Sequence, residues 1–253
     1  MRADQLLVER GLAASRSQAQ RLIAAGLRWR LGSGAWKAVN KNGDMVPEAA
    51  ELQLADAAES RYVSRGGLKL EGALKRTGQP VTGLRCLDVG QSTGGFSDCL
   101  LQQGAASVVG VDVGHGQLSE RLRADPRVVC VEKLNARELS AQALLAAAGE
   151  AAAPPFDLVV GDLSFISQTL VWPALAPLLK VDGHLLMLVK PQFELQPEQI
   201  GKGGLVRDPA SYALVEARMR QACAELGWHV LDYFASPITG GDGNREFFVW
   251  ACP

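Results

Sequence analysis

Seven short apolar runs recur along the last three quarters of the chain, and polar or helix-forming segments separate most of them. The runs are rich in Val, Leu and aromatic residues, and most end in a glycine or a charged residue, as buried strands do. Strands that alternate with helical segments predict a doubly wound, mostly parallel α/β sheet from about Arg65 onward. The runs lie at 84–89, 106–112, 127–131, 156–160, 184–189, 228–235 and 246–252.

The first 60 residues follow a different pattern. A helix is expected at 4–10, where Gly11 stops it, and Ser15 with Gln18 three positions later predicts a capping box for a second helix that ends at Gly26. These signals predict a compact α+β module that joins the larger domain at 65–253 through a linker at 61–64. Two or three short strands are expected from the turns at Gly32, Gly34 and Asn42-Gly43, before an acidic stretch at 47–59.

A glycine-rich turn follows the first apolar run of the larger domain. Its order is D-x-G-x-x-x-G-G, from Asp88 to Gly95, and a helix is expected near Ser97. Glycines let the backbone bend sharply beside a ligand, and a helix start offers free N–H groups. An acidic residue that enters the turn suits an amino-bearing ligand better than a pyrophosphate. The residues expected to bind this nucleotide cofactor are Asp88, Gly90, Ser92, Gly94, Gly95 and Phe96.

Two later strand ends extend the expected cofactor site. Asp112 ends the second apolar run, 24 positions after Asp88, a spacing that suits a contact with ribose hydroxyls. The third run leads to Asn135, where an adenine edge is expected, and Val113 and Asp162 complete the set. The alternative is that these are ordinary strand ends of a parallel sheet, since one glycine-rich turn matches many unrelated chains.

Composition and charge narrow the classes of protein. The chain has 253 residues, 47% hydrophobic and 21% charged, which predicts a folded core. Neither a membrane span nor a signal peptide is readable, so a cytoplasmic protein is expected. Five dispersed cysteines indicate reduced core residues, and no metal site is predicted. Residues 1–41 carry 8 Lys and Arg against 2 Asp and Glu, so the N-terminal end is the expected polyanion contact, although basic faces are often simply solvated.

The motifs resemble a known family. Residues 5–13, 15–19 and 21–23 resemble the S4 RNA-binding domain, in which a helix pair holds basic side chains against structured RNA. The whole chain resembles the hemolysin-like, or TlyA, ribosomal RNA 2′-O-methyltransferases, which join an S4 domain to an FtsJ-like methyltransferase. The matching segments are 62–70, 87–90, 92–96, 111–114, 162–167, 189–194 and 243–246. The resemblance implies S-adenosylmethionine as cofactor and an antiparallel final pair of strands.

The resemblance also implies a catalytic tetrad of Lys69, Asp162, Lys190 and Glu246. A ribose hydroxyl is a weak nucleophile, so transfer to it needs a base and close alignment. Lys190 is expected to act as the general base or to orient the hydroxyl, and Lys69 to stabilise the developing oxyanion. The two carboxylates are expected to orient the amines and the ribose. Taken singly, Asp162 and Lys190 could be ordinary polar strand ends, and Lys69 could lie on a solvated helix face.

A long polar loop at 191–209 follows Lys190. Phe193 is expected either to stack a splayed nucleobase or to pack inward as a lid on the cofactor, and these readings stay open. The other expected RNA contacts are basic: Arg2, Arg16, Arg21, Arg65, Lys202 and Arg207.

Three hypotheses about function follow. The first is 2′-O-methylation of ribose, with cytidine as the expected nucleoside, in ribosomal RNA. The short segment before Gln5 resembles the family's shorter form and suggests the large subunit. The second is a ribosome-assembly factor that binds ribosomal RNA without catalysis, and the third is a membrane-active hemolysin, after the family's historical name. Neither a long amphipathic basic segment nor an apolar span favours the third.

Overall fold

The computed structural model describes residues 1–13, 15–54, 61–241 and 243–253, which divide into two compact units, Met1–Leu68 and Lys69–Pro253. The expected module boundary at residue 60, the end of the acidic stretch at 47–59 and Asp242 lie outside the described residues. Within the described residues, no helix has the length and apolar character needed to cross a bilayer.

The N-terminal unit packs two helices against a small antiparallel sheet with the order β2-β1-β3. The helix stop at Gly11 is where the sequence places it, with φ at +68°. Ser15 Oγ accepts a bond from the Gln18 amide at 3.2 Å, and the Gln18 side chain donates to the Tyr62 carbonyl at 2.9 Å. The elements are α1 Ala3–Glu9, α2 Arg16–Gly26, β1 Leu27–Arg30, β2 Lys37–Ala38 and β3 Glu51–Leu54.

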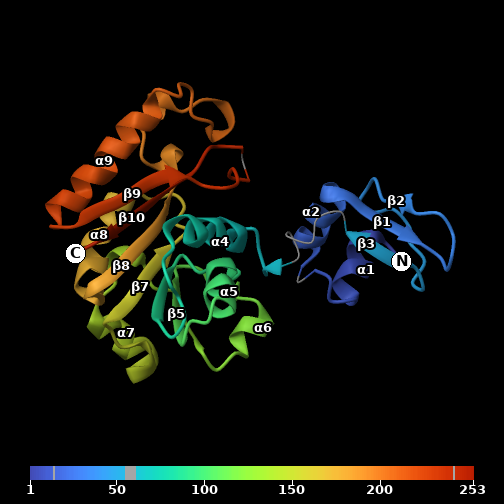
Figure 1. The fold of residues 1–253 in the computed structure, drawn as a ribbon, viewed down its shortest axis with the longest axis horizontal. Coiled ribbons are helices and arrows are strands. Elements are labelled where there is room, and N and C mark those ends of the chain that lie inside the picture. Colours follow the sequence, from blue (N-terminus) through green and yellow to red (C-terminus); the bar gives the residue numbers. More distant parts are fainter. Residues whose placement is uncertain (14, 55–60, 242) are drawn as a thin grey trace. The chain divides into compact units, whose positions relative to one another are not determined.

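The larger unit contains the predicted seven-stranded sheet, in the order β6-β5-β4-β7-β8-β10-β9 (Figure 1). All neighbours from β6 to β8 run parallel, and β10 pairs antiparallel with both β8 and β9. The α/β fold class and its antiparallel edge are therefore confirmed. The strands are β4 Arg85–Val89, β5 Ser107–Asp112, β6 Val128–Glu132, β7 Phe156–Gly161, β8 Leu179–Val189, β9 His229–Ala235 and β10 Phe247–Cys252.

Helices cover both faces of this sheet. One face packs on α7, α8 and α9 through large buried side chains such as Leu144, Trp172 and Met219. The other face carries Phe248, whose ring stacks on Phe96 of α5 with centroids 6.3 Å apart. The α-helices of this part of the chain are α4 Gly66–Thr77, α5 Gly95–Gln102, α6 Glu120–Arg123, α7 Ala141–Ala148, α8 Trp172–Leu175 and α9 Ser211–Glu225. Short 3₁₀ turns lie at Ala136–Glu138, Gly149–Ala152, Gln168–Leu170, Ala176–Leu178, Pro191–Phe193, Pro197–Gln199 and Lys202–Gly204.

The order of the strands reverses between β4 and β7. From β4 the chain winds outward to β5 and β6, and after β6 it returns to β7 and continues toward the other edge. The loops that leave β4 and β7 therefore diverge and leave a crevice at the carboxyl ends of these strands. Ligands of open α/β sheets bind in this position.

Candidate functional site

The sheet register brings distant polar residues to one edge. Val89 pairs with Gly161, so Gly90 and Asp162 are neighbours just beyond the ends of β4 and β7. Phe247 pairs with Val189 across the antiparallel β8–β10 ladder. Lys190 and Glu246, one residue beyond that pair, consequently meet at the same edge. Residues that are far apart in the sequence therefore cluster at this edge of the sheet.

The four tetrad residues form one chain of ion pairs. Lys69 Nζ lies 2.6 Å from Glu246 Oε2 and 3.6 Å from Asp162 Oδ2. Lys190 Nζ lies 2.6 Å from the other oxygen of Asp162. Asp162 therefore bridges the two ammonium groups, and each carboxylate is held by a lysine from a different element. The sequence separates these residues by up to 177 positions, yet the structure brings all four together.

Burial makes this cluster electrostatically strong. The side chains of Lys69 and Glu246 are only 9% and 3% exposed. Burial raises the pKa of Glu246, while the nearby charge of Lys69 opposes that rise. Charges at such depth interact more strongly than surface pairs and hold a fixed geometry. The cluster can therefore orient a hydroxyl group and stabilise charge that develops on its oxygen.

Sequence reasoning missed one contact of the cluster. Lys190 Nζ donates a hydrogen bond to Ser164 Oγ at 2.7 Å, in addition to its pairing with Asp162. Ser164 belongs to a motif that the resemblance already marks, but nothing in the sequence alone gave it a role. With Asp162 and Ser164 as partners, the direction of the Lys190 ammonium group is fixed. Its third N–H therefore points away from both of them.

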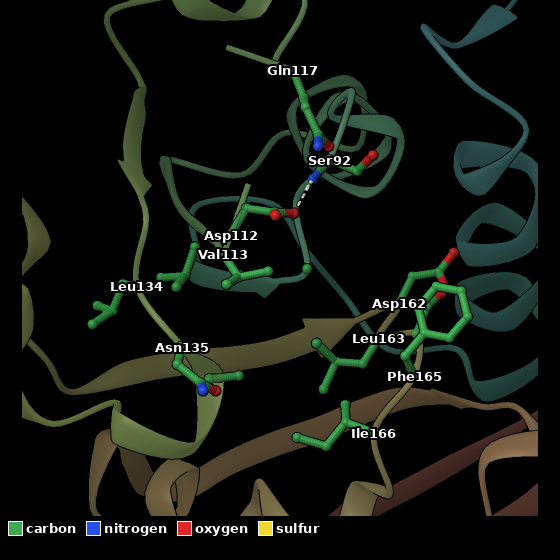
Figure 2. Close-up of a pocket in the computed structure, with 14 residues that line it drawn as sticks. Ser92, Asp112, Val113, Gln117, Leu134, Asn135, Asp162, Leu163, Phe165 and Ile166 are labelled. Atoms are coloured by element: carbon green, nitrogen blue, oxygen red, sulfur yellow. Dashed lines mark hydrogen bonds between the residues drawn. The ribbon is translucent and has the colours of Figure 1, made fainter. Parts of the chain in front are cut away.

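A cavity of about 490 Å³ opens beside the cluster at the strand-order reversal. Figure 2 shows Asp112 and Ser92 along one side and Asp162 and Phe165 along another, and Asp162 belongs to both the cavity and the tetrad. Asp112 accepts bonds from the backbone N–H groups of Ser92 and Gly114, both at 2.7 Å. Of the expected cofactor residues, those that line this cavity are Gly90, Ser92, Asp112, Val113, Asn135 and Asp162.

The other four expected cofactor residues do not line the cavity. Asp88 is completely buried, and its carboxylate accepts a bond from Ser97 Oγ at 2.7 Å, which ties the end of β4 to the start of α5. Burial raises the pKa of Asp88 to about 7. Gly94 adopts φ +97°, and a Cβ there would lie 2.3 Å from Leu122, so this glycine serves packing. Gly95 and Phe96 are buried in α5.

Gln91 stands in the glycine-rich turn, directly after Gly90. Its side chain is 3% exposed and donates to Ser97 Oγ at 2.8 Å. A Cβ on Gly110 would lie 1.9 Å from the Gln91 amide nitrogen, so a missing side chain on β5 makes room for the glutamine. Gln91 therefore packs beneath the turn, and it is absent from the cavity lining.

The remaining walls of the cavity were not predicted. Most of them are apolar, and they come from loops that flank the recognised strand ends. Val111 lies in β5 itself, and the others are marked in the sequence only by their position two to five residues beyond the ends of β5, β6 and β7. The added residues are Val111, Gln117, Leu134, Ala136, Leu163, Ser164, Phe165 and Ile166.

Two aromatic rings stand beside the tetrad. Phe165 is 91% exposed and has φ +64°, an unusual conformation for a bulky residue. Its ring centroid lies 5.0 Å from that of Phe193. Phe193 is half-buried and does not line the cavity. A strained, exposed phenylalanine at the rim of a cavity indicates a contact surface rather than a core residue.

Glu194 joins the two loops that carry these rings. Its buried carboxylate accepts bonds from Ser167 Oγ at 2.6 Å and from the Gln168 backbone N–H at 2.7 Å. Ser167 and Gln168 follow the loop with Asp162 and Phe165, whereas Glu194 follows Lys190 and Phe193. The bonds therefore tie together the loops after β7 and β8. The sequence motif contained Glu194, but its bracing role depends on contacts 26 and 27 positions away.

The expected RNA-binding arginines on the N-terminal helices have acidic partners. Arg2 Nε lies 3.0 Å from Asp4 Oδ1, and Arg16 Nη2 lies 2.8 Å from Asp4 Oδ2. Asp4 is fully buried, and the hydrogen bond from Arg2 holds the pKa of its carboxyl well below the usual range. The two guanidinium groups remain about half exposed, at 44% and 56%. Asp4 thus fixes their position and removes part of their net charge.

The other expected RNA contacts lie on separate elements. Arg21 is in α2, and its Nη1 donates to the Ser17 carbonyl at 3.3 Å. Arg65 is half-buried just before α4. Lys202 and Arg207 are exposed in the loop after β8. Across the described part of the chain, no group of three or more His, Cys, Asp or Glu side chains is placed to hold a metal ion.

Comparisons with known proteins agree with this architecture. Residues 62–252 match the FtsJ-like methyltransferase family, and residues 1–27 match the S4 domain. A 16S/23S rRNA (cytidine-2′-O)-methyltransferase TlyA from Mycobacterium tuberculosis is 46% identical over 98% of this chain and 88% of its own length. A putative rRNA methyltransferase, YqxC, from Bacillus subtilis is 43% identical over 98% of this chain and 84% of its own length.

A solved structure gives the same result for the fold. The putative hemolysin from Streptococcus thermophilus superposes with a TM-score of 0.75 at 39% identity, over 99% of this chain and 87% of that one. The resemblance noted from the motifs is therefore confirmed along nearly the whole chain. With its S4 domain, seven-stranded sheet and tetrad edge, this chain belongs to the FtsJ-like methyltransferases of the hemolysin-like TlyA type.

Proposed function

We propose that this protein transfers a methyl group from S-adenosylmethionine to the ribose 2′-oxygen of a cytidine in ribosomal RNA. One observation carries the proposal: Asp162 lies both in the wall of the cavity and in the ion-paired tetrad. A cofactor in the cavity is thus next to groups that can align and activate a hydroxyl. The high identity to an rRNA (cytidine-2′-O)-methyltransferase supports the nucleoside and the class of RNA.

The cavity residues fit S-adenosylmethionine. Val113, on the cavity wall, is 73% exposed, a large apolar exposure that a bound adenine would cover. Asp112 offers carboxylate oxygens to ribose hydroxyls, and Asn135 lies where an adenine edge can be read. A Cβ on Gly90 would lie 2.8 Å from the Asp162 carbonyl oxygen. Only glycine at position 90 therefore leaves the cavity open beside Asp162.

The tetrad side chains have distinct proposed roles. The bound cofactor supplies an electrophilic methyl group on a sulfonium centre. Lys190 holds the ribose hydroxyl and, once its ammonium group has given a proton to solvent, accepts the hydroxyl proton as a neutral amine, while Ser164 and Asp162 fix its direction. Lys69 stabilises negative charge on the oxygen, and Glu246 holds Lys69 in place from 2.6 Å. Alignment and proton transfer together can supply a large part of the rate enhancement.

For RNA, we propose that the paired rings of Phe165 and Phe193 receive the splayed target base. Phe193 lies outside the cavity lining, which supports base stacking over the alternative of a lid on the cofactor. The basic side chains of the helix pair, of the segment before α4 and of the loop after β8 are proposed to bind phosphates: Arg2, Arg16, Arg21, Arg65, Lys202 and Arg207.

The Phe193→Ala variant distinguishes the two alternative roles of Phe193, which are base stacking and a lid on the cofactor. Loss of a stacking platform is expected to raise the KM for RNA roughly 5- to 100-fold, since one base stack contributes about 1–3 kcal/mol. Cofactor affinity, measured by calorimetry without RNA, should stay within about twofold, and Phe193→Tyr should retain the RNA interaction. A lid would give the reverse result, with weaker cofactor binding and little change in the KM for RNA.

The proposed function is tested by methyl transfer from labelled S-adenosylmethionine to ribosomal subunits purified from cells that lack the modification. We propose the large subunit, in the cytoplasm, as the substrate, so label should enter 23S rRNA and digest to 2′-O-methylcytidine. Small subunits and protein-free RNA serve as comparisons. Tight cofactor binding without transfer to any RNA would instead support an RNA-binding assembly factor.

A further inference from the structure

A basic, aromatic hairpin in the N-terminal unit is not used by the proposed mechanism. Strands β1 and β2 and the connection between them lie within residues 27–41, which hold four Lys and Arg, two tryptophans and no Asp or Glu. The structure describes every residue of this segment. The hairpin therefore has a composition typical of nucleic-acid surfaces, apart from the helix pair that the resemblance assigns to RNA.

The register assigns side chains to the two faces of the hairpin. Trp29 pairs with Lys37, and Arg28 pairs with Ala38, in the antiparallel ladder. Leu27, Trp29 and the leucines of β3 pack on the core beneath α1 and α2. Because side chains alternate along a strand, Arg28 and Arg30 project from the opposite, outer face of this small sheet.

Trp36 is held over that outer face. The guanidinium carbon of Arg30 lies 4.6 Å from the centre of the Trp36 ring, and Arg30 also pairs with Glu51 of β3 at 2.6 Å. The arginine is thus held between a carboxylate and the ring. Trp36 remains 37% exposed, so its indole stays accessible at a defined position.

These features match a single unpaired nucleotide better than an apolar protein partner. An indole fixed by a guanidinium offers a stacking surface for a base, and cations beside it can bind the adjoining phosphates. Arg28 is exposed and shares the face of Arg30. Among the described hairpin residues, Leu31 is the other large hydrophobic side chain with high exposure, at 49%. Two such side chains make too small an apolar patch for a typical protein interface.

We propose that the outer face of this hairpin is a second RNA contact, in which Trp36 stacks one unpaired base and Arg28 binds its phosphate. The inference rests on the proposed function, since the RNA is the ribosomal RNA that the enzyme modifies. The contact lies on the face of the small sheet opposite the core beneath α1 and α2. The N-terminal unit can therefore grip folded RNA from two sides, which restricts the orientation in which it binds.

The test uses the full chain and large ribosomal subunits that lack the modification. We compare Trp36→Ala, Trp36→Leu and Trp36→Tyr, with Leu31→Ala as the matched control on the same hairpin. Trp36→Ala and Trp36→Leu are expected to weaken subunit binding and raise the KM for subunits roughly 5- to 100-fold, with kcat at saturation unchanged. Trp36→Tyr and Leu31→Ala should stay within about twofold of the wild type.

Ultraviolet crosslinking identifies what Trp36 touches. Trypsin cleaves after Arg30 and after Lys37, so it releases residues 31–37 as one peptide. This peptide should carry a crosslinked nucleotide. A crosslink to a ribosomal protein, or Trp36→Leu binding as tightly as the wild type, overturns the proposal. If wild type methylates subunits while all variants match it, only the hairpin contact is rejected. If wild type neither binds nor methylates any RNA, the proposed function fails first, and the hairpin contact fails with it.

Discussion

Replacement of Lys190 by alanine is expected to lower kcat for methyl transfer about 10²- to 10⁴-fold, the usual contribution of a positioned general base. Lys190 Nζ is held by Asp162 Oδ1 at 2.6 Å and by Ser164 Oγ at 2.7 Å, so its amine has a fixed direction at the edge of the cavity. Its side chain is not among those that line the cavity. Cofactor affinity should therefore change little, and the loss should appear in the chemical step.

Two further variants make this result specific. Lys190→Arg keeps a positive charge but cannot give up its proton at neutral pH, so it separates proton transfer from electrostatic orientation. Recovery of most activity in Lys190→Arg would show that Lys190 orients the hydroxyl rather than deprotonating it. Lys180→Ala is the matched control, because Lys180 is on β8, the strand that Lys190 directly follows, and it pairs with Asp157 at 2.5 Å but is 40% exposed. Single-turnover rates at saturating RNA and cofactor are the measurement.

The strand ends that carry Asp162 and Lys190 could be predicted because sheet geometry is local in sequence. A buried run of five or six residues ends at a definite position, and parallel strands bring their carboxyl ends to one edge. Glu246 joins them because β10 runs antiparallel, so its first residues reach the same edge. The apolar pattern therefore predicted the fold and placed Asp162, Lys190 and Glu246 at strand ends, while the family resemblance identified them as members of one tetrad. Lys69 required the family resemblance, because a lysine in a helix gives no local sign of burial.

The limits of prediction follow from contacts between distant residues. Asp88 and Gly94 stand in a ligand-binding motif, yet Asp88 bonds Ser97, and Gly94 packs on Leu122. Gln91 fits its turn only because Gly110 lies beneath it on the neighbouring strand. Such pairings depend on the register between β4 and β5 and on helix packing. No periodicity along the chain encodes them, so a motif predicted the class of site better than the role of each residue.

Replacement of Lys69 by methionine is expected to lower the free energy of unfolding by about 3–5 kcal/mol near pH 8, the usual effect of removing one partner from a buried ion pair. Glu246 is 3% exposed and would lose the ammonium group that lies 2.6 Å from its carboxylate. Methionine nearly matches the lysine stem in volume, so the loss reflects charge rather than a cavity. Methyl transfer should also fall, because the proposed oxyanion contact is removed.

The pH dependence identifies the cause. Burial already raises the pKa of Glu246, and Lys69 opposes that rise, so the variant should raise the pKa further. A carboxyl group whose pKa is higher in the folded than in the unfolded protein binds more protons when folded. Its contribution to stability therefore falls as the pH rises from the unfolded-state pKa to the folded-state pKa. The destabilisation of Lys69→Met should therefore be largest above the folded pKa of Glu246. It should shrink toward pH 4, where Glu246 is protonated in the folded protein.

A second substitution separates stability from chemistry. In the double variant Lys69→Met/Glu246→Gln the buried charge is gone, so denaturant unfolding should recover most of the lost stability, while methyl transfer stays low. The two substitutions are then non-additive for folding, as expected for residues in direct contact, and the recovered stability does not restore methyl transfer. Equal instability of the single and double variants would mean that Glu246 is not charged in the folded protein. Recovery of activity together with stability would assign Lys69 a structural role and remove it from the proposed reaction.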